Sequence, residues 1–174
     1  MLFPEIIILA VLSLIFVQDI RSRSVYWTLF PILVTLFILL HFLRHHLFGE
    51  IWQHVLINST FLIIQFLIVS VYFSIKNKHW VNITDGLLGW GDILLLLSLT
   101  FYLSALNFLL FYISSLIVSL LIWLFWQALS KEKNKHIPLA GFQALIFTVF
   151  LAGDWWFKSF DLTNDSWLLY LITK

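Results

Sequence analysis

Two aspartates lie at the ends of apolar segments, where they are candidates for chemistry. Asp19 ends the first apolar segment, and Asp92 directly precedes the unbroken apolar run 93–97. An ionisable group near the bilayer interior is costly and marks a candidate functional site. Two carboxyl groups that share a dry site cannot both ionise, so one acts as a base while the other holds a proton. Such a pair could activate a water molecule against a peptide carbonyl and protonate the leaving amine.

Glycines surround the second aspartate. Gly86, Gly89 and Gly91 are three of only six glycines in the chain. Glycine lets the backbone bend sharply or approach a substrate closely, and membrane depth tolerates irregular backbone only beside protein or a wet cavity. Alternatives remain for each acid taken alone. Asp19 could end a helix at the interface, Asp92 could be a first-turn acid favoured by the helix dipole, and Asp85 suits a helix cap.

The composition identifies the class of protein. Hydrophobic residues make up 61% of the 174 residues and charged residues 11%, and the mean hydropathy is +0.99. An ordinary globular domain is about half apolar and about a quarter charged, so these values indicate an integral membrane protein. The net charge of +1 gives no indication of a nucleic-acid partner. The chain has no cysteine, which excludes disulfides and thiolate chemistry.

Six apolar runs must position the two aspartates. They cover residues 2–17, 25–43, 51–75, 87–103, 106–129 and 138–152. A span needs about 20 apolar residues, so the sequence predicts an all-α, polytopic membrane domain of about six helices over residues 1–174. The start of the first run contains Glu5 and no Lys or Arg, unlike a cleaved signal peptide. We therefore expect this run to remain in the protein as a membrane anchor. The apolar run 168–172 is too short to cross the membrane and is expected to lie at the membrane–water interface.

The basic residues predict the orientation of these helices. Cytoplasmic loops carry an excess of Lys and Arg. The connections after the first, third and fifth runs contain seven basic residues, namely Arg21, Arg23, Lys76, Lys78, Lys131, Lys133 and Lys135. The opposite side contains three, namely Arg44, Lys158 and Lys174. The N-terminus is therefore predicted outside, and the three richer loops in the cytoplasm.

This topology brings the two carboxylates to one face of the membrane. The first helix runs inward and ends at Asp19, whereas the fourth runs outward and begins at Asp92. Both are therefore predicted at the cytoplasmic face, which is the minimum condition for cooperation between residues so far apart in sequence. Their titration would then belong to the pair and to neither residue alone.

Other polar residues within the apolar runs have simpler interpretations. His41, His45 and His46 include a four-residue helical spacing that could hold a metal, but they lack a matching carboxylate beyond Glu50. We interpret them as interfacial histidines and expect neither a metal nor another cofactor.

Two glutamines are also predicted inside the membrane. Gln65 lies in the third run and Gln143 in the sixth. Buried polar side chains in membrane helices commonly hydrogen-bond to a neighbouring helix. We therefore expect both glutamines to bond between helices.

The motifs around the aspartates resemble those of the prepilin peptidases, also called type IV leader peptidases, which are related to the archaeal preflagellin peptidases. Asp19 is followed by a short basic segment with Arg21 and Arg23 and then by Val25, as in that family's first signature. The stretch Gly89, Trp90, Gly91, Asp92 is similar to its second signature, the GxGD box. The Ile-Pro sequence at residues 137–138 resembles the start of the family's last helix. The resemblance covers nearly the whole chain.

The resemblance implies a function. Asp19 and Asp92 would be the catalytic pair of an aspartic endopeptidase in a prokaryotic cytoplasmic membrane, with Arg21, Arg23, Gly89 and Gly91 as motif or substrate-positioning residues. The substrates would be pilin-like precursor proteins, cut after a short basic leader just before their hydrophobic helix. Members that also methylate the new amino terminus tend to carry an extra cytoplasmic region with cysteines. This chain has neither, so cleavage without methylation is expected.

Some residues differ from the family pattern. Tyr26 and Trp27 stand where the family usually has Pro and Asn, and Leu94 stands where it commonly has Lys. Presenilin-like proteases share the GxGD box, but their partner aspartate follows a tyrosine within a helix, whereas Gln18 precedes Asp19 here. Two non-enzymatic alternatives remain, a degenerate peptidase that serves as a scaffold and a small proton-coupled carrier that uses the same carboxylates.

Overall fold

The computed structural model describes residues 3–44, 48–78, 89–129, 138–157 and 160–172, and in these ranges it is helical without strands. Several residues considered above, including Asp85, Gly86, His45, His46 and the basic residues of 131–135, lie outside the described ranges. The helices are α1 (Phe3–Ser22), α2 (Leu29–Leu43), α3 (Phe48–Asn77), α4 (Trp90–Leu99), α5 (Ala105–Leu129), α6 (Leu139–Ala152), a π-helical turn η1 (Gly153–Phe157) and α7 (Ser166–Ile172). Each predicted apolar run thus contains a helix.

Four helical segments are long and apolar enough to cross a membrane. They are Phe3–Ser22, Ile51–Asn77, Ala105–Ala128 and Leu139–Trp156. The two shorter apolar helices are α2 with 15 residues and α4 with 10 residues. At about 1.5 Å per residue, α4 rises about 15 Å, which is about half the thickness of the hydrocarbon core. The chain is therefore a helical, multi-pass membrane protein with helices of unequal length.

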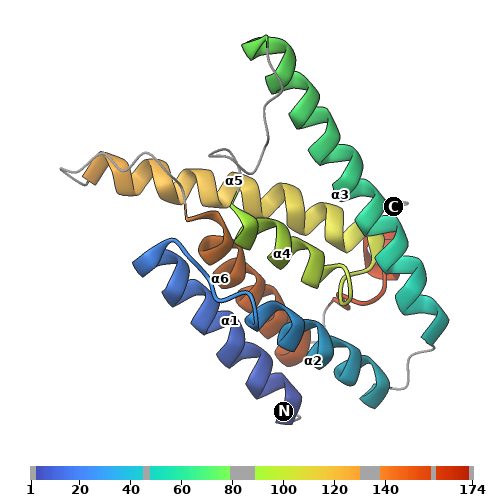
Figure 1. Cartoon of the computed structure of the whole chain (residues 1–174). Helices are drawn as coiled ribbons and strands as arrows, with labels where there is room; N and C mark the ends of the chain where they lie inside the picture. Colours follow the sequence, from blue (N-terminus) through green and yellow to red (C-terminus); the bar gives the residue numbers. More distant parts are fainter. Residues whose placement is uncertain (1–2, 45–47, 79–88, 130–137, 158–159, 173–174) are drawn as a thin grey trace.

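The core lies where α1, α2, α4 and α6 meet. Helix α1 packs against both α6 and α2, and α4 packs against α2 and α6. Fully buried aliphatic and aromatic side chains from all four helices fill the centre, including Ile8, Leu12, Leu33, Phe37, Leu95, Leu99, Ala144 and Phe147. Figure 1 shows that the C-terminal end of α1 and the N-terminal ends of α4 and α6 lie at the same end of this group.

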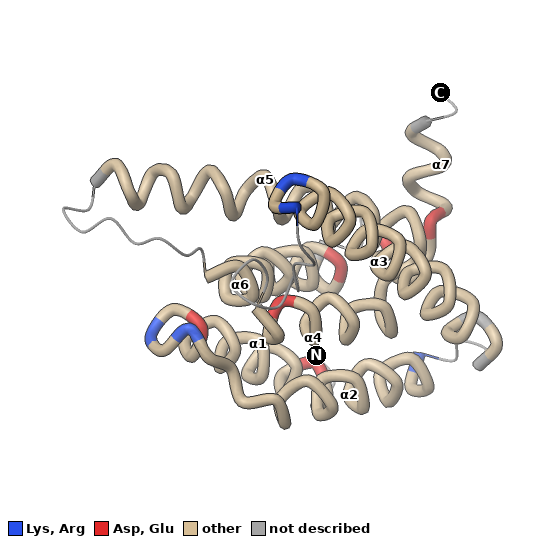
Figure 2. The backbone as a smooth tube through the Cα atoms, turned by 45° about the horizontal axis from the view of Figure 1, so that its top comes forward, with Lys and Arg blue, Asp and Glu red and all other residues tan. Residues whose placement is uncertain are grey.

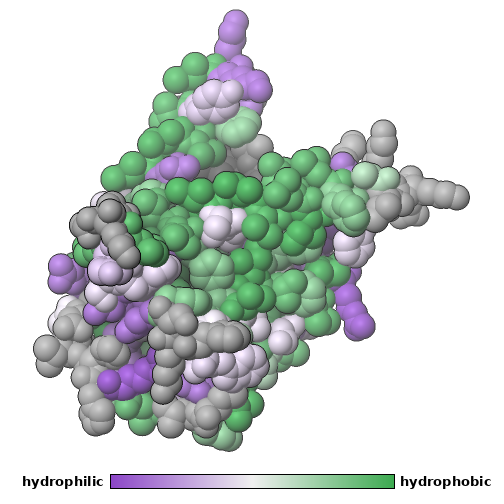
Figure 3. All heavy atoms as spheres, turned by 180° about the vertical axis from the view of Figure 1, so that it is seen from behind, coloured by the Kyte–Doolittle hydropathy of each residue, from purple (hydrophilic) through white to green (hydrophobic). Residues whose placement is uncertain are grey.

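Helices α3 and α5 extend beyond this core. They contact each other, and they diverge so that the C-terminal end of each projects beyond the other helices (Figure 1). Figure 2 shows the backbone with its described charged residues in blue and red, and they occupy only a few places along the helices. Figure 3 shows that the rear face is hydrophobic over most of its middle, with hydrophilic residues mainly at its edges. So large an exposed apolar surface is unfavourable in water and is expected where a protein faces lipid.

A buried polar cluster joins the helices at the end opposite Asp19. Arg44, which follows α2, pairs with Glu5 of α1 at 3.1 Å and with Asp154 of η1 at 3.5 Å. Tyr102, in the turn between α4 and α5, donates its hydroxyl to Asp154 at 2.9 Å and accepts the indole N–H of Trp155 at 3.1 Å. We call these five residues the Arg44 cluster. It ties four parts of the chain together at one end of the core.

Candidate active site

Asp19 lies in the last turn of α1 and is buried, with 8% of its surface exposed. Its Oδ2 atom accepts a 2.6 Å hydrogen bond from the backbone N–H of Gly141, the third residue of α6. The first N–H groups of a helix have no partner within the helix. The Asp19 carboxylate therefore accepts a hydrogen bond from one of these N–H groups, which has no acceptor within α6.

Asp92 is the third residue of α4 and is also buried, with 9% exposed. Its Oδ2 atom accepts the backbone N–H of Gly89 at 2.9 Å, so it caps its own helix. In a full capping box the residue before the helix also accepts a bond through its side chain. Gly89 has no side chain, so Asp92 supplies the only side-chain bond of this cap. The carboxylate also interacts with the backbone N–H of Ala140 in α6 and with the charge of Asp19. Asp92 is thus a first-turn acid and a neighbour of Asp19 at the same time.

The two aspartates meet at one turn of α6. Asp19 interacts with the N–H of Gly141, and Asp92 with the N–H of the preceding residue, Ala140. One peptide repeat of about 3.8 Å and two hydrogen bonds of about 3 Å limit the separation of the carboxyl groups to roughly 10 Å. The fold thus brings the two residues to the start of α6, where neighbouring backbone N–H groups contact both carboxyl groups.

The two glycines of this site differ in how closely their neighbours approach. A Cβ atom on Gly141 would lie 3.1 Å from Asp19 Oδ2, 3.2 Å from Asp19 Cβ and 3.4 Å from the carbonyl oxygen of Phe16. These contacts are tighter than most Cβ contacts, so any larger residue here would require Asp19 or the helix to shift by a few tenths of an ångström. On Gly91 a Cβ atom would make ordinary contacts, the nearest being 3.7 Å from Val25 and 3.8 Å from Ala140.

The two sequence motifs contact each other through Gly91. Val25, which ends the first motif, and Ala140 of α6 both lie within 4 Å of the position that a Cβ atom on Gly91 would occupy. The connection that carries Val25 is itself fixed, because Gln18 Oε1 accepts the backbone N–H of Tyr26 at 3.1 Å. Arg23 directly follows α1 with a positive φ of 51°, and its N–H donates to the carbonyl of Asp19 at 2.9 Å. The chain therefore turns sharply just after the first aspartate.

The remaining motif residues lie at the rim of the site. Arg21, Arg23 and Gly89 are exposed. Among the positions that differ from the family pattern, Tyr26 is 72% and Trp27 70% exposed, whereas Leu94 is partly buried and packs against the hydrophobic core. Leu94 thus contributes to packing where a lysine would bring a charge to the core.

Ala140 and Gly141 were not predicted as site residues. They act through backbone N–H groups, which have no residue-specific signal in a sequence. The only local indication is Pro138, which directly precedes α6 and is common near helix starts because it needs no N–H partner there. The Arg44 cluster was also not predicted, since Arg44 and Glu5 lie far apart in the sequence.

Other polar residues of the membrane helices are buried or bond between helices. His41 is buried, with 4% exposed; within the described part of the chain no three His, Asp or Glu side chains are grouped as metal ligands would be. Gln143 lies 3.5 Å from Ser115 of α5 through its Nε2 atom, and Gln65 of α3 bonds to Tyr112 of α5. The expected bonds of both glutamines between helices are confirmed.

The chemistry available here is that of two buried carboxyl groups next to a helix N-terminus. The positive end of α6 favours negative charge at this point, while the apolar surroundings disfavour it. A pair in such a place can hold one charge and one proton, which is the requirement for acid–base catalysis on a bound water. No known protein family, curated protein or solved structure matches this chain.

Proposed function

We propose that this chain is a membrane aspartic endopeptidase that removes the short basic leader of type IV pilin-like precursors, without methylating the new amino terminus. The observation that carries the proposal is the interaction of Asp19 and Asp92 with consecutive N–H groups of α6. The motifs around both aspartates, described above, support the choice of substrate. The protein would cross a prokaryotic cytoplasmic membrane six times, with its N-terminus outside and the aspartates at the cytoplasmic face.

In the proposed reaction the pair shares one proton. The ionised carboxylate takes a proton from a water molecule, whose oxygen forms a bond to the carbonyl carbon of the scissile peptide. The protonated carboxyl gives its proton to the leaving nitrogen as the C–N bond breaks. One product ends in a carboxyl group and the other begins with an amino group, and the pair again holds one proton.

A proton-coupled carrier is less well supported. Such a carrier needs polar groups along its path. Between Glu5 and Asp19, α1 presents Ile8, Leu12 and Ile15 to the core, each with no exposed surface. The core-facing positions of α1 between its two polar ends are therefore aliphatic, and α1 offers no polar path from one end to the other.

The test is co-expression with pilin-like precursors from the same genome. Wild type should shorten at least one precursor, and Asp19→Asn and Asp92→Asn should each abolish the shortening while leaving the protein in the membrane. The matched control is Asp161→Asn, because Asp161 is exposed and its Oδ1 accepts the N–H of Thr163 at 2.8 Å, a bond that asparagine can keep. If wild type cleaves none, or either site variant cleaves at the normal rate, the proposal is wrong, and a scaffold becomes the better interpretation.

A further inference from the structure

Three buried polar side chains belong to the packed pair of helices α5 and α6. Gln143 of α6 and Ser115 and Ser119 of α5 have no exposed surface. Ser115 donates its hydroxyl to the carbonyl of Tyr112 at 3.1 Å, and the Gln143 Nε2 atom lies 3.5 Å from Ser115 Oγ. Gln143 Oε1 and Ser119 Oγ, in contrast, bond to no residue that the structure describes.

The packing of α5 against α6 shows where Ser119 lies. Phe111 of α5 stacks edge-on against Phe147 of α6, with ring centroids 5.3 Å apart, and one turn further along α5 Ser115 faces Gln143. The helices are therefore antiparallel here, and the next turn brings Ser119 to the level of Leu139. That is the first turn of α6, whose next two residues interact with Asp92 and Asp19.

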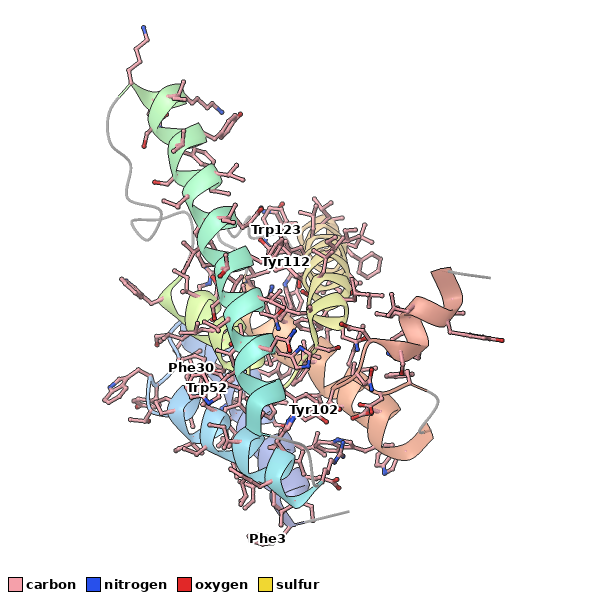
Figure 4. The ribbon with its side chains drawn as sticks, turned by 90° about the vertical axis from the view of Figure 1, so that its right-hand side faces the viewer. Phe3, Phe30, Trp52, Tyr102, Tyr112 and Trp123 are labelled. Carbon is pink, nitrogen blue, oxygen red and sulfur yellow. The ribbon has the colours of Figure 1, made fainter. Side chains whose placement is uncertain are left out.

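The polar positions continue toward the end of α5. Trp123 follows Ser119 by one helical turn, is partly buried, and has a buried indole N–H that bonds to no described residue. Figure 4 shows Tyr112 and Trp123 on the side of α5 that faces α3. Residues four apart lie on one face of a helix. Ser115, Ser119 and Trp123 thus lie along one stripe of α5, which begins beside Gln143 of α6 and turns toward α3 at Trp123.

Buried oxygen and N–H groups without a protein partner are costly, and in native proteins they generally bond to ordered water. This group offers one acceptor, one hydroxyl and one donor, within an otherwise apolar membrane interior. A small neutral molecule that both donates and accepts hydrogen bonds suits all three.

We propose that Gln143, Ser119 and Trp123 form a buried water-binding track that supplies the hydrolytic water to the Asp19–Asp92 pair. The supply role rests on the proposed peptidase function, whereas the binding of water does not. Gln143 and Ser119 act as positioning residues for water and do not themselves exchange protons with the substrate.

The test uses the full-length protein and two variants, Gln143→Leu and Ser119→Ala. Gln65→Leu is the matched control, because it removes the same amide from a bond between α3 and α5 that lies outside the track. With a cleaved precursor as substrate, we expect both track variants to lower kcat by about tenfold or more with KM unchanged and the Tm within about 2 °C of wild type. Gln65→Leu should leave kcat unchanged.

A high-resolution structure provides the readout that needs no activity. Wild type should show ordered density about 3 Å from Gln143 Oε1 and Ser119 Oγ, and Gln143→Leu should lose it. If wild type lacks this density, or if the track variants keep normal kcat, the track proposal is wrong even when the enzyme cleaves. If the density is present but no precursor is cleaved, water binding stands and the peptidase function fails.

Discussion

The Asp19 carboxylate accepts a 2.6 Å hydrogen bond from the backbone N–H of Gly141, across 122 residues of sequence. This bond joins the end of α1 to the start of α6. Because Asp92 interacts with the neighbouring N–H of Ala140, the two acids are fixed relative to each other by one turn of backbone. The site and the packing of α1 on α6 therefore depend on the same contacts.

Gly141→Ala should disrupt this junction. The added Cβ would lie 3.1 Å from Asp19 Oδ2 and 3.2 Å from Asp19 Cβ, so the Asp19 side chain or α6 must shift. We expect this overpacking to cost about 1–3 kcal/mol. Thermal unfolding in detergent should show a lower Tm, and cleavage should be lost. Gly91→Ala is the control, because its Cβ would make only ordinary contacts and alanine is the better helix former. Equal destabilisation by both variants would contradict the packing described here.

Asp92→Asn and Asp92→Ala should differ in stability although both remove the acid. Asparagine keeps an oxygen to accept the Gly89 N–H, now bonded at 2.9 Å, whereas alanine leaves the first turn of α4 uncapped at a cost of about 0.5–2 kcal/mol. Denaturant or thermal unfolding of the two variants measures the difference directly. If the alanine variant is as stable as the asparagine variant, Asp92 does not cap α4.

Arg44→Met should destabilise the fold far from the aspartates. It would leave Glu5 and Asp154 buried without their cation, and removing one partner from a buried ion pair costs about 3–5 kcal/mol. Lys76→Met is the matched control, because Lys76 is exposed on α3 and surface substitutions change stability by about 0.5 kcal/mol or less. Similar unfolding temperatures for the two variants would show that the Arg44 cluster contributes little.

The free energy of unfolding should depend on pH in the alkaline range because of Tyr102. Burial raises the pKa of its hydroxyl, which lies in the turn between α4 and α5, and the Asp154 carboxylate raises this pKa further. The folded protein therefore keeps the proton where an unfolded chain loses it. The stabilising contribution of the hydroxyl is full below about pH 10 and declines as the pH rises above it.

The measurement compares wild type with Tyr102→Phe. The variant loses the bonds to Asp154 and Trp155, so it should be less stable by about 1–3 kcal/mol near neutral pH. Unfolding temperatures recorded from pH 8 to pH 11 should show this gap narrowing toward the alkaline end. A gap that stays constant or widens would mean that the hydroxyl does not remain protonated in the folded state.

Local pattern alone was enough to predict most helices. Continuous apolar runs of about 20 residues can satisfy their backbone in lipid only as helices, and each predicted run contains one. The lengths were predicted less well, since α4 has 10 residues and α2 has 15. Helix ends depend on which neighbours cover them, as at the C-terminal end of α4, where Leu99 and Tyr102 are both buried in the core.

The sequence by itself determined the membrane class, the helical segments and the two aspartates at one end of the molecule, because composition and charge act locally along the chain. Only the tertiary structure decided what holds those aspartates. The N–H groups of Ala140 and Gly141, the closeness that Gly141 permits, and the pairing of Arg44 with Glu5 arise between segments far apart in sequence. Such contacts depend on how whole helices pack. Every residue other than proline carries a backbone N–H, so residue type does not reveal which N–H groups bind the aspartates.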